Sequence, residues 1–114
     1  MNLAVEKLPK YTLIKVLDSK LDTNIAPDLK SELVVISGNG AKNIVLDLSN
    51  CQYCDSSGLS AILVANRLCK NVEGTFVLAG LTEPVKELVK LSQLDTVLNI
   101  ADNQEAVDSF FKSE

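Results

Sequence analysis

The chain has 114 residues, and we expect a single domain over residues 1–114 because this length is close to the commonest domain size. Hydrophobic residues make up 46% of it and charged residues 23%, which is typical of a compact soluble fold and excludes a disordered or collagen-like chain. Its 15 acidic and 11 basic side chains give a formal net charge of −4, which repels a phosphate backbone. We therefore expect no nucleic-acid partner.

Histidine is absent from the sequence. A Ser-His-Asp or Cys-His nucleophile and a histidine-ligated metal site therefore cannot be built from one chain. No run of about 18 apolar residues is present to span a bilayer, and the charged residues among the first twenty argue against a signal peptide. These features predict a cytoplasmic protein without membrane insertion, in which the three cysteines are reduced thiols.

The first part of the chain predicts a β-hairpin followed by a helix. Residues 3–8 and 11–17 have strand patterns and are separated by a proline turn. From residue 25 to residue 36, apolar side chains recur at spacings of four, four and three, which is the helical period. We expect Thr23 or Asn24 to be the N-cap of this helix.

The middle of the chain predicts a strand, a buried helix and a second strand. The apolar run at residues 44–48 suits a strand that is covered on both faces. Apolar residues then occupy a wide arc of a helix between residues 59 and 72, so that helix must be largely buried. Gly74 ends it, and residues 75–79 form another apolar strand.

Two more helices and a strand complete the predicted fold. Thr82 is expected to cap a helix with an apolar stripe at Val85, Leu88 and Val89, and residues 96–100 to form the last strand. Asp102 with Glu105 fits a capping box for a terminal helix, whose inward-facing residues are expected to be Ala106, Val107, Phe110 and Phe111.

The predicted order is ββαβαβαβα, with about four helices and a mostly parallel, mixed α/β sheet that begins with the hairpin. In such a sheet, ligands and partners meet the loops that follow the carboxyl ends of the strands. Three loops have this position, at residues 20–24, 51–58 and 80–83.

The second of these loops contains Asp55-Ser56-Ser57-Gly58, where the chain enters the buried helix. Free backbone donors and a partial positive charge make a helix N-terminus a favourable place for a phosphate, so a phosphorylated serine would be tolerated there. On the outside, the added charge would repel a docked partner. The simpler alternative is that Asp55, Ser56 and Ser57 only cap the helix. Gly58, which is unfavourable inside a helix, indicates a close approach of other backbone.

Cys51 and Cys54 suggest a rival function, because C-x-x-C between a strand and a helix is the spacing of a thioredoxin-like redox pair. Against it, Asp55 stands nearer the helix start and would raise the pKa of a nearby thiol. Cys69, on the buried helix, is most simply a core residue.

Metal and nucleotide sites find little support in the sequence. A zinc site lacks a fourth ligand at any suggestive spacing, and a receiver-type phosphoaspartate site would have only the scattered Asp18, Asp22 and Asp47. No P-loop and no GxGxxG motif occurs. We therefore expect no metal and no cofactor.

Taken in order, the motifs resemble the STAS domain of bacterial anti-sigma factor antagonists, and the resemblance covers nearly the whole chain. Its most specific part is Asp-Ser-Ser-Gly-Leu at residues 55–59. The other matching segments are Lys20-Leu21-Asp22 with Ala26 and Leu29, and residues 43–48, 53–54, 74–78, 84–85 and 94–95.

The resemblance implies a partner switch without catalysis by this chain. In the family, the serine after the aspartate is phosphorylated by an ATP-dependent serine kinase that is itself the anti-sigma factor; by position this is Ser56. The unphosphorylated protein captures the anti-sigma factor and frees sigma for transcription, and a serine phosphatase reverses the modification. The expected partner-binding residues are Asp22, Thr23, Asp55, Ser56, Ser57 and Gly58.

Two alternatives stay open at this point. The domain could instead be a subunit of a transport complex, since related domains serve there, or the cysteine pair could act as a dithiol oxidoreductase. The sequence does not distinguish a monomer from a dimer.

Overall fold

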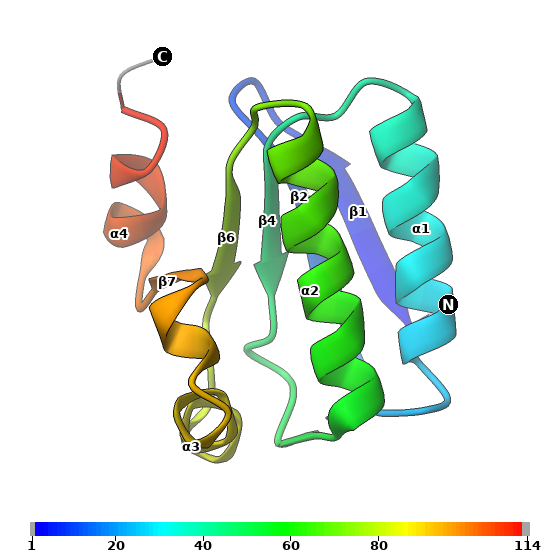
Figure 1. Cartoon of the computed structure of the whole chain (residues 1–114), viewed down its shortest axis with the longest axis vertical. Coiled ribbons are helices and arrows are strands. Elements are labelled where there is room, and N and C mark those ends of the chain that lie inside the picture. Colours follow the sequence, from blue (N-terminus) through cyan, green and yellow to red (C-terminus); the bar gives the residue numbers. More distant parts are fainter. Residues whose placement is uncertain (1, 113–114) are drawn as a thin grey trace.

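A five-stranded sheet forms the centre of the structure, a computed structural model that describes residues 2–112 (Figure 1). Its strand order is β1-β2-β4-β6-β7, and β1 is antiparallel to β2 whereas the other neighbours are parallel. The strands are β1 (Leu3–Lys7), β2 (Thr12–Val16), β4 (Ile44–Asp47), β6 (Phe76–Ala79) and β7 (Asn99–Ala101). The predicted hairpin and the mostly parallel α/β sheet are confirmed.

Helices cover both faces of this sheet. They are α1 (Ala26–Gly38), α2 (Ser56–Asn71), α3 (Glu83–Leu91) and α4 (Gln104–Ser109), together with a short 3-10 turn, η1 (Leu94–Thr96). The α1 and α2 helices lie side by side on one face (Figure 1). On the other face, Val107 and Phe111 from α4 and the turn after it pack against Val45 and Val77.

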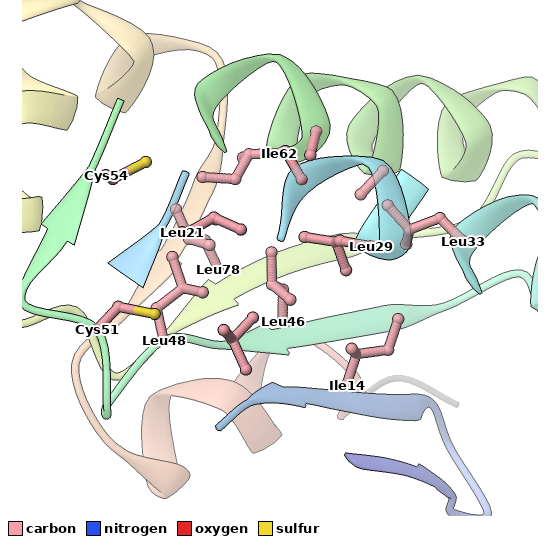
Figure 2. Packing of buried hydrophobic residues seen from close by; sticks show 14 of the residues in the cluster. Ile14, Leu21, Leu29, Leu33, Leu46, Leu48, Cys51, Cys54, Ile62 and Leu78 are labelled. Atoms are coloured by element: carbon pink, nitrogen blue, oxygen red, sulfur yellow. The ribbon is translucent and has the colours of Figure 1, made fainter. Parts of the chain in front are cut away.

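The strands β4 and β6 are apolar on both sides because both faces of the sheet are covered there. In β4, Ile44 and Leu46 face the larger core under α1 and α2, whereas Val45 faces the smaller one under α4. Figure 2 shows Leu46 and Leu78 in the larger core with Leu29 and Ile62 from the helices above. This layering explains the continuous apolar run that predicted a buried strand.

Two short strands form a second sheet that the sequence did not predict. They are β3 (Lys20–Leu21) and β5 (Tyr53–Cys54), which pair in parallel. Both lie inside segments for which the sequence predicts loops, residues 20–24 and 51–58. A two-residue strand is too short to show an alternating pattern, so its pairing depends on tertiary contacts alone.

Several predicted helix and strand starts are wrong. The N-cap of α1 is Ile25, not Thr23 or Asn24, because the Asp22 carbonyl oxygen accepts hydrogen bonds from the amides of Ile25 and Ala26 at 3.1 and 2.8 Å. The last strand begins at residue 99 instead of 96, because residues 94–96 form η1.

The terminal helix also starts differently from its predicted capping box. Asn103, not Asp102, is the N-cap of α4, and its side-chain oxygen accepts a hydrogen bond from the Ala106 amide at 2.8 Å. Asp102 instead forms an ion pair with Lys86 at 3.6 Å. Phe110 was expected to face inward but is exposed, whereas Phe111 is buried and stacks on Tyr11.

None of the helices formed by residues 2–112 is both long and apolar enough to cross a bilayer.

Candidate functional site

The small second sheet brings the first and second predicted loops together. Lys20 lies opposite Tyr53 and Leu21 opposite Cys54, so the two strands end side by side. The Asp55 amide donates a hydrogen bond to the Leu21 carbonyl oxygen at 3.3 Å, which continues the pairing by one residue. The loops that begin at Asp22 and Asp55 therefore leave the same edge.

Asp55 is the N-cap of α2 and has an extended backbone. Its Oδ1 atom accepts a hydrogen bond from the Gly58 amide at 3.1 Å, and its carbonyl oxygen accepts one from the Leu59 amide at 3.0 Å. Its Oδ2 atom accepts a longer hydrogen bond from the Thr23 hydroxyl at 3.4 Å. The Asp55 carboxylate thus both starts the helix and connects it to the neighbouring loop.

Asp22 has a different local role from Asp55. Its Oδ1 atom accepts a hydrogen bond from the Asn24 amide at 3.0 Å, and its carbonyl oxygen holds the start of α1. Short-range hydrogen bonds of this kind, in which a carboxylate oxygen accepts from the amide two residues later, are typical of Asx turns. The loop from residue 22 to residue 25 is therefore held in one shape beside the start of α2.

Ser56 is the first residue of α2, and its side chain is exposed. No hydrogen bond within residues 2–112 holds its hydroxyl group. Because Asp55 occupies the amides of Gly58 and Leu59, the amides of Ser56 and Ser57 are the helix donors left without an acceptor in the described chain. Ser57 is half-buried. Of the two serines, Ser56 is the one presented to solvent.

Gly58 is buried where α2 crosses the small sheet. A Cβ atom at this position would overlap the Leu21 carbonyl oxygen and lie 2.6 Å from the Cys54 sulfur. The backbone approach expected at Gly58 is therefore that of β3, and the Cys54 side chain of β5 lies close to the same position. Figure 2 shows Leu21 and Cys54 on these two strands, as part of the larger hydrophobic core.

The third predicted loop, residues 80–83, joins the site through Thr82. Thr82 is the N-cap residue of α3, but its hydroxyl makes no capping bond and instead donates a hydrogen bond to the Cys51 carbonyl oxygen. This contact spans 31 positions of the sequence, so no local pattern signals it. It attaches α3 to the segment that leads into β5.

The cysteines are buried free thiols, which is a poor arrangement for dithiol chemistry. Burial, then the charges of Asp18 and Asp47, raises the pKa of Cys51 to about 11. Burial, then the charge of Asp55, raises the pKa of Cys54 to about 12. A redox nucleophile needs a lowered pKa, whereas the pKa values of both of these thiols are raised.

Cys69 lies in the core on α2, as predicted, and burial raises its pKa to about 11. The carboxylates of the receiver-type alternative are occupied locally: Asp18 accepts a hydrogen bond from the Lys20 amide and Asp47 one from the Ser49 amide, at 3.0 and 2.8 Å. Over residues 2–112, no three acidic or cysteine side chains gather where they could hold a metal ion.

A family model described as the STAS domain matches residues 2–107. Two curated relatives each align with this chain over most of its length and most of their own. BtrV of Bordetella bronchiseptica, assigned by its name to the anti-sigma factor antagonists, is 29% identical over 99% of this chain and 97% of its own. The anti-sigma F factor antagonist of Paenibacillus polymyxa is 31% identical over 91% of each.

Solved structures share the fold at lower identity. A Thermotoga maritima protein assigned to the anti-sigma factor antagonists superposes with a TM-score of 0.86, at 20% identity over 96% of this chain and 94% of that one. The phosphorylated form of Bacillus SpoIIAA gives 0.72, at 20% identity over 95% and 98%. A sulfate transporter family protein from Wolinella succinogenes gives 0.75, at 16% identity over 88% and 83%.

Replacing Gly58 with alanine should destabilise the protein. Alanine favours a helix by about 1 kcal/mol, but the new methyl group would overlap the Leu21 carbonyl oxygen, and we expect a net loss of about 1–3 kcal/mol. Gly38→Ala is the matched control, because a Cβ atom there meets nothing within 4 Å. Urea unfolding measures both variants. Equal stability of Gly58→Ala and Gly38→Ala would contradict the close packing of α2 on β3.

The thiols should titrate only in strong alkali. In the native protein we expect no thiolate absorbance at about pH 8 and a midpoint above about pH 10, because burial disfavours the charged form. In denaturant the midpoint should return to about 8.5. Since the unfolded thiols ionise first, the free energy of unfolding should fall as the pH rises above about 9. A native midpoint near neutral pH for Cys51 or Cys54 would revive the redox alternative.

Proposed function

The chain belongs to the STAS domain family, and on that premise we propose that it is an anti-sigma factor antagonist controlled by phosphorylation of Ser56. When Ser56 is unmodified, the protein binds an anti-sigma factor that is a serine kinase and so releases sigma factor for transcription. When Ser56 is phosphorylated, the complex dissociates until a serine phosphatase removes the phosphate. The observation that carries this proposal is the exposed Ser56 hydroxyl at the first position of α2.

Phosphorylation would take place in the complex, with ATP bound by the kinase. The Ser56 Oγ atom attacks the γ-phosphorus, the bond from that phosphorus to the β,γ-bridging oxygen breaks, and ADP leaves. The hydroxyl proton passes to a base of the kinase. This chain contributes the nucleophile and the surface that positions it, so the catalysis belongs to the partner.

The fold can accept this modification without rearrangement. A phosphoserine adds about −1.5 to −2 charges, and a helix N-terminus stabilises negative charge through its dipole and free amides. The amides of Ser56 and Ser57 have no acceptor in the described chain and are available to the phosphate. The hydroxyl is already in solvent, so a phosphate there displaces no buried group.

The negative charge of a phosphate on Ser56 would also repel the partner. Asp55 is adjacent to Ser56 in sequence. Asp22 directly follows β3, and β3 pairs with β5, the strand that directly precedes Asp55. A phosphate added beside these carboxylates makes the edge strongly negative. A partner surface that can dock against two carboxylates is then repelled by a much larger negative charge. Thr23, whose hydroxyl donates a hydrogen bond to Asp55, lies within the same surface.

The curated relatives support this function over a transport subunit. Both BtrV and the Paenibacillus polymyxa protein carry the name of an anti-sigma factor antagonist, and both align over nearly their whole length. The transporter family protein from Wolinella succinogenes is 16% identical, which is a likeness of fold alone. The proposed exchange of partners takes place in the cytoplasm, where ATP and sigma factors are found.

Phosphate should be transferred to Ser56 alone. The kinase is obtained by affinity capture on the unmodified protein, with Ser56→Asp as the negative bait, and is then purified and incubated with ATP. We expect the parent protein and Ser57→Ala to gain one phosphate on Ser56, and Ser56→Ala to gain none, as measured by intact-mass and peptide mass spectrometry. Ser57→Ala is the matched control, because it removes the neighbouring hydroxyl of the same helix turn.

The proposal fails if Ser56→Ala is phosphorylated as readily as the parent, or if the phosphate maps to another residue. It also fails if no serine kinase is captured in a manner that depends on Ser56. Failure to capture such a kinase would leave the transport-complex alternative as the better account of this fold.

A further inference from the structure

Strand β1 forms one edge of the main sheet, and β2 is its only neighbouring strand in the described chain (Figure 1). Residues 4–7 of β1 are exposed. Proteins usually protect such an edge with a proline, a bulge or a covering element. The strand contains no proline, and its register with β2 runs without a bulge. A hollow of about 260 Å³, lined by residues that include Val5, Lys7 and Ile36, separates the edge from the end of α1. The outer side of β1 is therefore open to a further strand.

The pairing of β1 with β2 decides which backbone groups of β1 point outward. The Leu17 amide donates a hydrogen bond to the Asn2 carbonyl oxygen at 2.8 Å. The Leu8 amide donates one to the Tyr11 carbonyl oxygen at 2.9 Å. Hydrogen-bonded pairs alternate along an antiparallel ladder, so the even-numbered residues of β1 bond to β2 and the odd-numbered ones point their N–H and C=O groups away from it. These outward residues are Leu3, Val5 and Lys7.

The outward groups fit a second copy of the same strand. An antiparallel pair with a twofold axis at Val5 places Val5 opposite Val5 and Leu3 opposite Lys7, so every outward group has a partner. A shift of this register by two residues places Glu6 opposite Glu6, and a shift by four places Lys7 opposite Lys7. Like charges directly opposite each other are destabilising. A shift in the other direction takes Lys7 beyond the end of the facing strand. The sequence therefore favours the register centred on Val5.

This register also brings opposite charges together. On the face of the sheet that carries the smaller core, Ala4 lies beside Lys15 of β2 and would lie beside Glu6 of the second copy. Lys15 and that Glu6 are then two strand spacings apart, about 10 Å. The small Ala4 side chain between them lets the two long side chains meet. Within residues 2–112, neither Lys15 nor Glu6 has an ion-pair partner. The twofold axis repeats the contact, so the interface gains the same ion pair twice.

We propose that the chain forms a homodimer in which two β1 strands pair antiparallel about Val5 and join both sheets into one. The start of β1 lies at the end of the molecule that carries the candidate site, because Leu3 pairs with Val16 and β2 leads from there to β3. Antiparallel pairing therefore places the two candidate sites at opposite ends of the dimer. Both Ser56 hydroxyls stay accessible, and the dimer presents two separate sites. The inference does not depend on the proposed function.

A thiol at the twofold axis should cross-link the dimer. In a hydrogen-bonded antiparallel pair the Cα atoms are about 5.5 Å apart, which suits a disulfide. With oxidised glutathione, we expect Val5→Cys to form a disulfide-linked dimer at least about tenfold faster than Val72→Cys, as measured by intact mass before and after reduction. Val72 is the matched control, because it is 42% exposed at the end of α2, and Val5 is 43% exposed. The native cysteines are buried and do not compete.

The unmodified chain should associate reversibly. Pairing of five residues from each copy is a small interface, so we expect sedimentation equilibrium to give a Kd on the order of 10–100 μM. Val5→Pro should raise this Kd at least about tenfold, because it removes an outward N–H group, whereas an edge strand tolerates proline where the N–H faces solvent. Val5→Thr is the control, because it keeps the N–H group and the β-branched shape. Its Kd should stay within about threefold of the parent.

Charge reversal tests the register without changing the backbone. Glu6→Lys should raise Kd, because the second copy's Lys15 then faces a like charge, and adding Lys15→Glu should restore it. Thermal midpoints check that each variant is folded. A parent protein that stays monomeric up to about 1 mM would overturn the inference. So would cross-linking through Val5→Cys that is no faster than through Val72→Cys, or a Kd that charge reversal leaves unchanged. These results leave phosphorylation of Ser56 untouched, so the two proposals fail separately.

Discussion

The carboxylate of Asp55 connects the two loops of the candidate site, because its two oxygens accept hydrogen bonds from different segments of the chain. One oxygen accepts a hydrogen bond from the Gly58 amide and starts α2, and the other accepts one from the Thr23 hydroxyl of the neighbouring loop. With Asp55 in this position, the next residue stands at the outer edge of the helix end. The exposure of Ser56 is therefore a consequence of the cap, and the glycine at position 58 allows the capped turn to press against β3.

The main sheet and its helices could be predicted from the sequence because their signals are local and repeated. The apolar run at residues 44–48 and the helical spacing from residue 25 to residue 36 each extend over several residues and agree with the fold. The short strands β3 and β5 could not be predicted in this way. Each has two residues, and each forms because the other is there, more than thirty residues away.

The candidate site was only partly predictable for the same reason. Asp55, Ser56, Ser57 and Gly58 are consecutive, so a helix start could be inferred from them directly. The hydrogen bond from the Thr82 hydroxyl to the Cys51 carbonyl oxygen, which attaches α3 to the site, could not be inferred, because the two residues are 31 positions apart in the sequence. The predicted helix caps were also wrong at Thr23 or Asn24, because α1 starts from the Asp22 carbonyl oxygen with Ile25 as its N-cap, and at Asp102, because the neighbouring Asn103 caps α4.

A capped helix end with one exposed hydroxyl separates the stability of the fold from the control of binding. The most direct test compares the protein before and after phosphorylation of Ser56, with respect to its affinity for the anti-sigma factor and its own thermal midpoint. The account predicts that Kd rises about 100-fold or more, which corresponds to about 3 kcal/mol, while the midpoint moves by no more than about 3 °C. A large fall in the midpoint with unchanged affinity would contradict it, because the phosphate would then act on the fold and not on the surface.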